Sequence, residues 1–281
     1  MSYTKEDVRR YHGLPRPGKI EVMPSKKATT QDDLTLAYSP GVAEACRDIV
    51  TDEAAAAKLT GRSNLVAVVT NGTAVLGLGN IGPLAGKPVM EGKSMLFKLF
   101  ADVDAFDIEL DCSDPDRLID IVKALEPTFG GINLEDIRGP ECSYIEEELK
   151  KSMNIPVFHD DQHGTAVITG AALMNASRIT GRDIADMKIV VMGAGAAGMA
   201  CARFYASMGV KKENISMFDI KGLIHAGRTD LSDVQMTFAQ KEPAPGASIA
   251  DTLYAAMEGA NLFLGLSGPG TLKPDMLKGM A

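Results

Sequence analysis

The architecture of this chain can be inferred from one segment, Lys188-Ile189-Val190-Val191-Met192-Gly193-Ala194-Gly195-Ala196-Ala197-Gly198. Its first five residues form an apolar strand, and its glycines have the spacing G-x-G-x-x-G. The first glycine permits a tight turn, the second lets the backbone approach a pyrophosphate, and the third lets strand and helix pack closely. A helix over 199–208 should follow, and its N-terminus favours phosphate charge. The segment therefore predicts a Rossmann-type dinucleotide-binding unit.

The next predicted strand, 215–218, ends in Asp219, which lies 21 positions after Gly198. A carboxylate there can accept hydrogen bonds from the adenosine ribose and favours the free 2′-hydroxyl of NAD. Lys221, His225 and Arg228 could instead neutralise the 2′-phosphate of NADP if their loop folds back, or they could form a solvated surface. The choice between NAD and NADP stays open. The candidate cofactor-binding residues are Gly193, Gly195, Ala196, Ala197, Gly198, Asp219, Lys221 and Thr165.

Strands and helices also alternate before this unit, which predicts a second α/β domain. The expected strands are 64–70, 105–110, 131–134 and 155–159, and the expected helices are 42–59, 92–101, 115–125 and 143–152. The run 74–78 follows the turn Asn71-Gly72 and could form a hairpin with the first strand. A small-residue helix over 165–179 begins where the composition shifts at Gly164. We therefore expect two α/β domains, residues 1–163 and 164–281.

Length and composition agree with two folded domains. The chain has 281 residues, 45% of them hydrophobic and 23% charged, which excludes a mostly disordered protein. Its net charge of −8, without a Lys/Arg run, predicts neither nucleic-acid nor membrane partners. No apolar stretch suits a membrane span or a secretory signal, so we expect a cytoplasmic protein. The four scattered cysteines should be reduced and mostly buried. The proline-containing first thirty residues, with a short helix over 5–11, resemble the arms that join subunits.

Two acidic pairs stand at predicted strand ends, Glu135-Asp136 and Asp160-Asp161. In an open α/β sheet the ligand crevice forms at the carboxyl ends of the strands, so these carboxylates could converge there. Several carboxylates in one crevice repel each other unless a cation lies among them, and oxygen ligands suit Mg²⁺ or Mn²⁺ better than Zn²⁺. Each pair alone could also be a helix cap or a solvated turn. His159 and His163 flank the second pair and are expected to be structural.

Five ordered motifs then resemble those of the malic enzyme family, most closely its bacterial branch that is often fused to a phosphotransacetylase-like domain. They are Leu36-Ala37-Tyr38-Ser39-Pro40-Gly41-Val42-Ala43, Asn71-Gly72-Thr73-Ala74-Val75-Leu76-Gly77-Leu78-Gly79-Asn80-Ile81-Gly82, Glu91-Gly92-Lys93, Leu134-Glu135-Asp136 and Phe158-His159-Asp160-Asp161-Gln162-His163-Gly164-Thr165. The resemblance covers essentially the whole chain.

The resemblance implies an oxidoreductase that decarboxylates L-malate to pyruvate and CO₂ while it reduces a nicotinamide cofactor. It matches Glu135, Asp136 and Asp161 to metal ligands, with Mg²⁺ or Mn²⁺ as the ion. It also matches Lys93 to the general base, Tyr38 to the general acid, and Asp160 to a neighbour that supports the lysine or the metal. NADP is expected over NAD because this branch often uses it, and a homodimer is expected.

The residue types suit that chemistry. Hydride leaves C2 only if the hydroxyl proton is removed, and an amine beside cations or in an apolar pocket can act as the base. A divalent ion polarises the new carbonyl and holds the enolate charge as CO₂ departs. A phenol such as Tyr38 can then protonate C3.

Two departures from the family pattern are expected to matter. Ala74 occupies the position where larger members carry an arginine that binds the substrate carboxylate. Another cationic side chain must therefore bind that carboxylate, or malate binds more weakly. The chain also stops at Ala281, before later glycine-rich motifs, which predicts a truncated dinucleotide domain with an exposed sheet edge. Two alternatives therefore stay open. One is a non-catalytic or regulatory fragment, and the other is a two-domain dehydrogenase of the amino-acid dehydrogenase type, which would need no metal.

Overall fold

A computed structural model describes residues 3–281, which form two compact units. The first unit ends at Phe158 and the second begins at His159. This division falls inside a strand, a few residues before the predicted boundary at Gly164. Each unit contains its own four-stranded sheet.

The first sheet has the order β2-β1-β3-β4. Its strands are β1 (Leu65–Thr70), β2 (Asp104–Glu109), β3 (Gly131–Leu134) and β4 (Val157–His159). The central strand β1 pairs in parallel with both β2 and β3, and its residues 67–70 are buried. A near-continuous apolar run suits such a strand because helices cover both faces of a parallel sheet.

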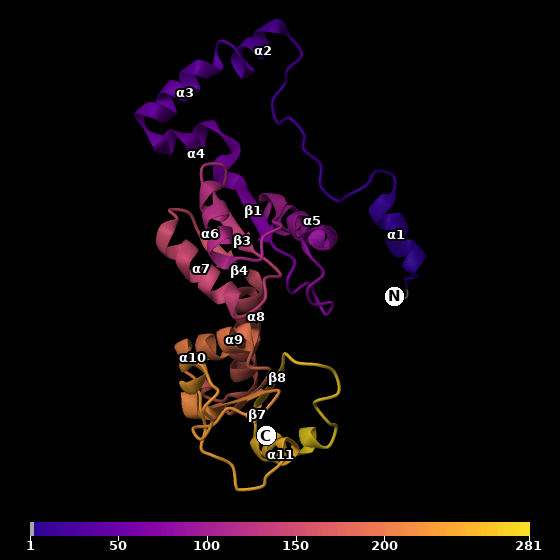
Figure 1. The fold of residues 1–281 in the computed structure, drawn as a ribbon, viewed down its shortest axis with the longest axis vertical. Helices are drawn as coiled ribbons and strands as arrows, with labels where there is room; N and C mark the ends of the chain where they lie inside the picture. The colour runs from indigo at the N-terminus through magenta and orange to yellow at the C-terminus, as the bar shows by residue number, and fades with distance from the viewer. Residues whose placement is uncertain (1–2) are drawn as a thin grey trace. The chain divides into compact units, whose positions relative to one another are not determined.

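The covering helices of this sheet are α5 (Pro83–Ala101), α6 (Pro115–Ala124) and α7 (Glu141–Ser152). Helix α5 packs against β1 and β2, whereas α6 and α7 pack against each other on the opposite side of the sheet (Figure 1). Two of these helices start at a proline in the first turn, where the missing N–H costs nothing. Asp114 caps α6 by accepting a hydrogen bond from the backbone N–H of Arg117 at 3.0 Å.

The predicted hairpin over 74–78 is wrong. Both edges of β1 are occupied by parallel neighbours, so no edge is left for an antiparallel partner. Residues 71–82 instead form a closed loop in which the N–H groups of Ile81 and Gly82 donate to the carbonyl of Gly72 at 3.2 and 3.1 Å. Gly72 has φ +68°, and a Cβ on it would lie 2.3 Å from the backbone of Gly82. Only glycine permits this approach.

Three predicted helices have different limits. The helix expected over 42–59 is divided into α3 (Val42–Thr51) and α4 (Ala56–Leu59), with the short 3₁₀ turn Glu53–Ala55 between them. Asp52 ends α3 and caps that turn. The helix expected from 92 begins at Pro83. The helix expected from 165 is α8 (Asp160–Thr180), which begins earlier because two aspartates in its first turn interact favourably with the helix dipole.

The N-terminal arm comprises α1 (Lys5–Gly13), an extended segment, α2 (Gln31–Ala37), α3 and α4 (Figure 1). None of the residues 3–60 is buried. The extended segment is held on α5, because Lys19 donates from its backbone N–H to Glu91 Oε2 at 3.2 Å and from Nζ to the carbonyl of Pro88 at 2.7 Å. Large apolar side chains are exposed along the arm, including Val22 (75%), Leu36 (74%) and Val50 (87%).

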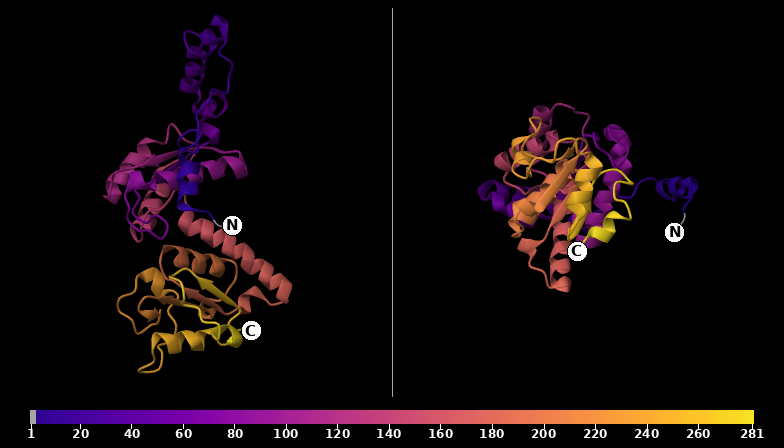
Figure 2. Two further views of the ribbon diagram at one scale, coloured as in Figure 1. Left: turned by 90° about the vertical axis from the view of Figure 1, so that its right-hand side faces the viewer. Right: turned by 90° about the horizontal axis from the view of Figure 1, so that it is seen from below.

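The second sheet has the order β7-β6-β5-β8. Its strands are β5 (Ile189–Met192), β6 (Ile215–Asp219), β7 (Gly222–Leu223) and β8 (Leu262–Gly265). The strand β5 is parallel to β6 and β8, and β7 is antiparallel to β6. Ile189 and Val191 face a core built with α8 and α9, whereas Val190 faces a core built with α11. The ribbons in Figure 2 show helices on both faces of this sheet. This alternation follows from the two-residue period of a strand.

The helices of the second unit are α8, α9 (Ala196–Ser207), α10 (Asp233–Met236) and α11 (Ile249–Met257). Helices α8 and α9 approach each other closely through small residues: a Cβ on Gly170 of α8 would lie 2.4 Å from the ring of Phe204 on α9. Thr169 and Cys201 face each other across the same contact at 3.6 Å. The remaining 3₁₀ turns are Gly61–Asn64, Ile184–Asp186, Lys212–Asn214 and Met276–Gly279.

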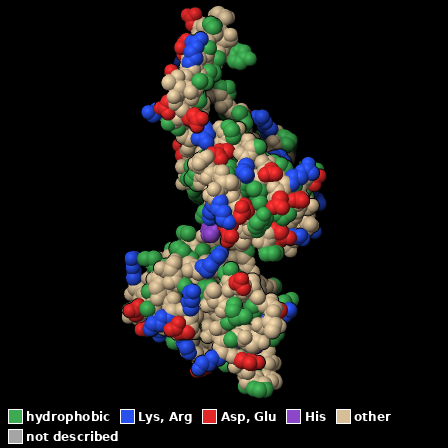
Figure 3. All heavy atoms as spheres, turned by 60° about the vertical axis from the view of Figure 1, so that its left-hand side comes forward, with side chains coloured by type: hydrophobic (Ala, Val, Ile, Leu, Met, Phe, Trp, Pro, Cys, Tyr) green, Lys and Arg blue, Asp and Glu red, His purple; other side chains and the backbone are tan. Residues whose placement is uncertain are grey.

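The surface agrees with the charge balance of the sequence. On the face drawn in Figure 3, acidic and basic side chains are interspersed without a continuous basic patch. Among residues 3–281, no helix is both long enough and apolar enough to cross a bilayer. Three cysteines are buried and Cys46 is exposed, and all four are free thiols.

The glycine loop yields a stability prediction. A Cβ on Gly198 would lie 1.8 Å from the carbonyl oxygen of Gly193, whereas a Cβ on Gly195 would meet no described atom within 4 Å. We expect Gly198→Ala to lower the free energy of unfolding by about 2 kcal/mol or more, because backbone must move to relieve the clash. Gly195→Ala is the matched control and should cost less than about 0.5 kcal/mol in urea unfolding. Equal losses in the two variants would contradict this account of the loop.

Candidate active site

Acidic side chains gather at the carboxyl end of the first sheet. Glu135 and Asp136 directly follow β3, and Asp161 lies two residues after the neighbouring strand β4. One carboxylate oxygen from each of the three lies within 4.8 Å of the others. Glu135 and Asp136 are 6% and 5% exposed. The structure thus brings together the three residues that the sequence analysis assigned to a metal.

Two consecutive carboxylates can converge here because the backbone turns sharply at Asp136. In a strand, successive side chains point to opposite faces of the sheet. Asp136 has φ +53°, in the left-handed region that Asp tolerates better than most residues. Its carbonyl accepts a hydrogen bond from Ala74 N–H at 3.0 Å, so the 71–82 loop holds the turn in place.

Glu135 is oriented by two side chains. Lys93, on α5, places Nζ 3.1 Å from Glu135 Oε1. Asn133, two residues earlier on β3, donates from Nδ2 to Glu135 Oε2 at 2.9 Å. The Lys93 side chain is 22% exposed and that of Glu135 is 8% exposed, so this ion pair is largely shielded from water. The expected base and an expected metal ligand are therefore in direct contact.

The donor set fits a hard divalent cation. Three carboxylates this close repel each other, and Lys93 offsets part of their charge. All three candidate ligand atoms are oxygens, as Mg²⁺ and Mn²⁺ prefer. His159 is fully buried, with Nδ1 3.9 Å from Asp161 Oδ2, as expected for a structural residue that orients a neighbour.

Asp160 is not among the three clustered acids. Its carboxylate lies over Gly164 one turn along α8, where an added Cβ would be 2.2 Å from Asp160 Oδ1. Glycine at this position therefore makes room for the carboxylate. This packing is a structural role that the sequence analysis did not anticipate, and the supporting role expected for Asp160 stays a prediction.

Tyr38 lies apart from this cluster. It follows α2, and its side chain is 78% exposed. Helix α2 packs on α3, and Figure 1 draws it well separated from α5, which carries Lys93. The described residues of this chain therefore do not bring the expected general acid to the expected base.

In the second unit, the glycine loop has the shape that a pyrophosphate needs. Gly193 has φ +124°, and a Cβ there would lie 2.7 Å from the carbonyl oxygen of Leu266. Gly195 is the N-cap of α9 and has open space where a Cβ would stand, and Ala196 and Ala197 form the first turn. These residues fit a dinucleotide because the backbone N–H groups at this helix end are accessible to an anion. Thr165 is half-buried on α8.

At the ribose end, Asp219 closes β6 as predicted. Its Oδ1 accepts hydrogen bonds from Lys221 N–H at 2.8 Å and Arg228 Nη1 at 2.9 Å, and its Oδ2 lies 2.7 Å from Arg228 Nη2. Burial raises the pKa of Asp219, but the hydrogen bonds from Arg228 and the Lys221 backbone lower it more, so the net shift is downward. The loop does fold back: the Arg228 side chain is only 10% exposed. Arg228 is therefore not part of a solvated surface, whereas Lys221 is 64% exposed.

Three features of these sites were missed. Asn133 could have been found, since it stands two residues before Glu135 on the same face of a strand. Asp230 lies in no recognisable sequence motif, so nothing in the sequence singled it out. The third is an ion-pair cluster between α5 and β2. In it, Lys87 of α5 pairs with Asp107 and Glu109 of β2. Burial and the hydrogen bond to Asp107 raise the pKa of Glu109 to about 7.

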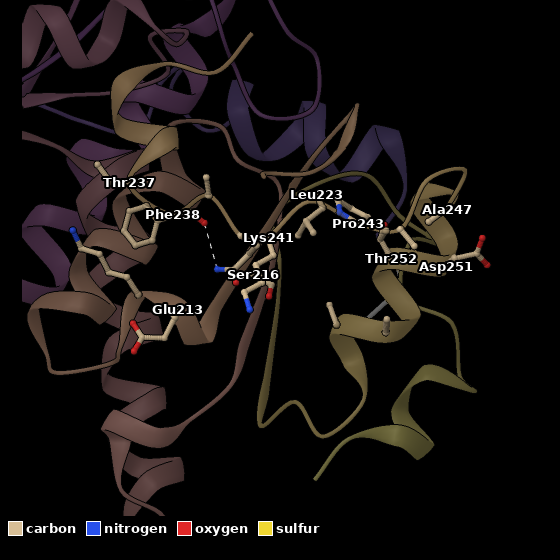
Figure 4. Close-up of a pocket in the computed structure, with 16 residues that line it drawn as sticks. Glu213, Ser216, Leu223, Thr237, Phe238, Lys241, Pro243, Ala247, Asp251 and Thr252 are labelled. Carbon is tan, nitrogen blue, oxygen red and sulfur yellow. Dashed lines mark hydrogen bonds between the residues drawn. The ribbon is translucent and has the colours of Figure 1, made fainter. Parts of the chain in front are cut away.

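A groove in the second unit is separate from these residues. It has a volume of about 750 Å³ and lies between β6, the 237–247 segment and α11 (Figure 4). Ser216, Phe238 and Asp251 are among its lining residues, which do not include the glycine loop or Asp219. The candidate dinucleotide site is therefore defined by the backbone geometry of the glycine loop and not by this groove.

Two family models match the chain. The model described as malic enzyme, N-terminal domain, covers residues 17–150, and that described as malic enzyme, NAD binding domain, covers residues 162–281. The matched ranges contain Glu135, Asp136 and the glycine loop, and Asp161 lies one residue before the second range.

Curated relatives agree. An NADP-dependent malic enzyme of Haemophilus influenzae is 56% identical over 96% of this chain and 35% of its own length. An NAD-dependent malic enzyme of Rhizobium meliloti is 54% identical over 96% of this chain and 34% of its own length. The chain thus spans about a third of the length of these relatives.

Solved structures extend the match to three dimensions. The NAD-dependent malic enzyme of Thermotoga maritima is 43% identical, with a TM-score of 0.88 over 100% of this chain and 73% of that one. The malic enzyme of Pyrococcus horikoshii is 42% identical, with a TM-score of 0.89 over 99% of this chain and 66% of that one. Family models over both units, close relatives and similar structures lead to one conclusion: this chain belongs to the malic enzyme family.

Proposed function

We propose that the chain carries out the oxidative decarboxylation of L-malate to pyruvate and CO₂ with reduction of NAD(P). The observation that carries the proposal is the convergence of Glu135, Asp136 and Asp161 beside Lys93 in a chain with a dinucleotide loop. Family membership removes the amino-acid dehydrogenase alternative. The competing hypothesis is a non-catalytic fragment, and a measurement of malate turnover distinguishes the two.

Lys93 is proposed to accept the C2 hydroxyl proton of malate as hydride passes to the nicotinamide. Glu135 holds the amine in place at 3.1 Å, and Asn133 fixes the carboxylate from its other side. Glu135, Asp136 and Asp161 would hold Mg²⁺ or Mn²⁺, which supplies Lewis-acid stabilisation of the C2 oxygen when bound. Asp160 is proposed to support this group from the first turn of α8.

Tyr38 is proposed to return a proton to C3 after CO₂ departs. Because its side chain is 78% exposed, it can act only when the arm is packed against a further surface. We propose that a second copy of the chain supplies that surface, so that the protein is a homodimer. The absence of buried residues over 3–60 supports an arm that completes its packing outside its own chain.

NADP is proposed as the preferred cofactor because three relatives that are 54–56% identical are NADP-dependent malic enzymes. NAD is the alternative, since a relative that is 54% identical is NAD-dependent. L-malate is the proposed small-molecule substrate. The cytoplasmic location expected from the sequence stays a prediction.

The first test concerns the base. We expect Lys93→Ala to lower kcat about 10²- to 10⁴-fold while KM for malate changes less than about threefold, because the amine acts in the transition state. NADP⁺ reduction is followed with L-malate and Mn²⁺. Lys98→Ala is the matched control, since Lys98 lies on the same helix and is 54% exposed. Wild-type kcat in Lys93→Ala would remove Lys93 from the mechanism.

The second test concerns the metal and needs no turnover. Mn²⁺ at about 100 times its Kd should stabilise the protein by about 2.7 kcal/mol and raise Tm by several degrees. Asp136→Asn and Asp161→Asn should abolish most of this shift, because each removes one ligand charge. Asp120→Asn removes an exposed carboxylate from α6 and should keep the shift. The same shift in all four proteins would place the ion elsewhere.

The third test concerns the arm. Leu36→Asp combined with Val50→Asp should convert the dimer to a monomer in light scattering. Burying the two introduced carboxylates in the dimer interface would cost several kcal/mol of association free energy. The control is Ile179→Asp, which changes an apolar side chain that is 85% exposed at the end of α8. A wild-type chain that is monomeric at micromolar concentration would refute the proposed dimer.

A further inference from the structure

Four charged residues form a closed network at the end of β6, which we name the ribose quartet: Asp219, Lys221, Arg228 and Asp230. Arg228 lies between the two carboxylates, with Nη2 2.7 Å from Asp219 Oδ2 and 2.9 Å from Asp230 Oδ2. Lys221 Nζ also lies 2.7 Å from Asp230 Oδ2. Two positive and two negative groups leave the quartet with no net charge.

Every N–H donor of the Arg228 guanidinium is used in a hydrogen bond. Its Nε donates to Asp230 Oδ1 at 3.0 Å, and Nη2 donates to both carboxylates. Its Nη1 donates to Asp219 Oδ1 at 2.9 Å and to the carbonyl of Leu223 at 3.4 Å. These contacts use all five N–H groups that an arginine offers.

The two carboxylates of the quartet are held differently. Asp219 belongs to β6, and its side chain is 20% exposed. Asp230 lies on the loop before α10, and its side chain is 37% exposed. Hydrogen bonds from Arg228 and Lys221 hold the pKa of Asp230 below its usual range, so it stays ionised at neutral pH. Asp230 is thus the member that can leave without disrupting a strand.

The loop that carries Arg228 and Asp230 is tied to the glycine loop. Ser232 caps α10, and Gln235 on that helix donates from Nε2 to the carbonyl of Ala194 at 3.3 Å. The quartet therefore stands where the adenosine ribose of a dinucleotide would lie, beyond the pyrophosphate loop and at the end of β6.

We propose that Asp230 is a specificity-determining residue, which occupies the donors of Arg228 and Lys221 that a 2′-phosphate would use. The inference rests on the proposed dinucleotide-dependent function. NAD⁺ binds with the quartet intact, and Asp219 accepts from the ribose hydroxyls. NADP⁺ binds by displacing the Asp230 carboxylate. Its 2′-phosphate then accepts hydrogen bonds from the Arg228 guanidinium and the Lys221 amine. Asp230 thereby makes NADP⁺ bind less tightly than it would without this carboxylate, and it leaves the affinity for NAD⁺ unchanged.

The test is calorimetric titration of the full chain with NADP⁺ and with NAD⁺, in the absence of malate and metal. Asp230→Asn leaves the quartet with one positive charge and should tighten NADP⁺ binding about tenfold while the Kd for NAD⁺ changes less than twofold. Asp230→Glu keeps the carboxylate and should retain the wild-type ratio of the two Kd values. The control for net charge is Glu213→Gln, an exposed acid at the opposite end of β6, which should leave that ratio unchanged.

Three results would overturn the inference. One is an Asp230→Asn variant in which both cofactors change equally, another is an effect that Glu213→Gln reproduces, and the third is no binding of either dinucleotide to wild type and variant. If the binding ratio shifts as expected but malate is not turned over, only the proposed reaction fails. The two proposals are therefore separable.

Discussion

Repulsion among carboxylates at the end of the first sheet is the constraint on which the rest of the structure depends. Burying Glu135 and Asp136 costs free energy, and adding Asp161 within 4.8 Å increases that cost. The chain offsets part of it with Lys93 and with the amide of Asn133. The loop over 71–82 and the left-handed turn at Asp136 hold the arrangement. In the proposed function this local cost is tolerated because the three acids would hold a divalent cation.

Elements with a strong local pattern could be predicted from the sequence. The strands at 131–134 and 189–192 are apolar over nearly their whole length, and the glycine loop at 193–198 has a steric requirement at each glycine. The two acidic pairs stood out by their places at strand ends, and the family resemblance then matched Glu135, Asp136 and Asp161 to metal ligands. In each case a short segment determines the geometry.

Features that depend on distant partners could not be predicted. The run 74–78 has strand character, but only the pairing of β1 with β2 and β3 shows that no edge is left for it. Asp230 has no sequence signal, because its role depends on a loop that returns to Asp219. Tyr38 was expected beside Lys93, whereas its position depends on what covers the arm. Local pattern thus predicted most of the elements and the glycine loop, whereas the roles of Lys93, Tyr38 and the acids were implied by the family resemblance. Neither predicted the contacts made through loops.

The close packing of α8 on α9 has a mechanical consequence. Gly170 lets the two helices approach until the ring of Phe204 touches the α8 backbone, and helices packed so tightly move as one piece. Asp161 is the second residue of α8, and α9 starts at the glycine loop. The glycine loop at the start of α9 and the first turn of α8, which carries Asp161, are therefore connected through one closely packed pair of helices.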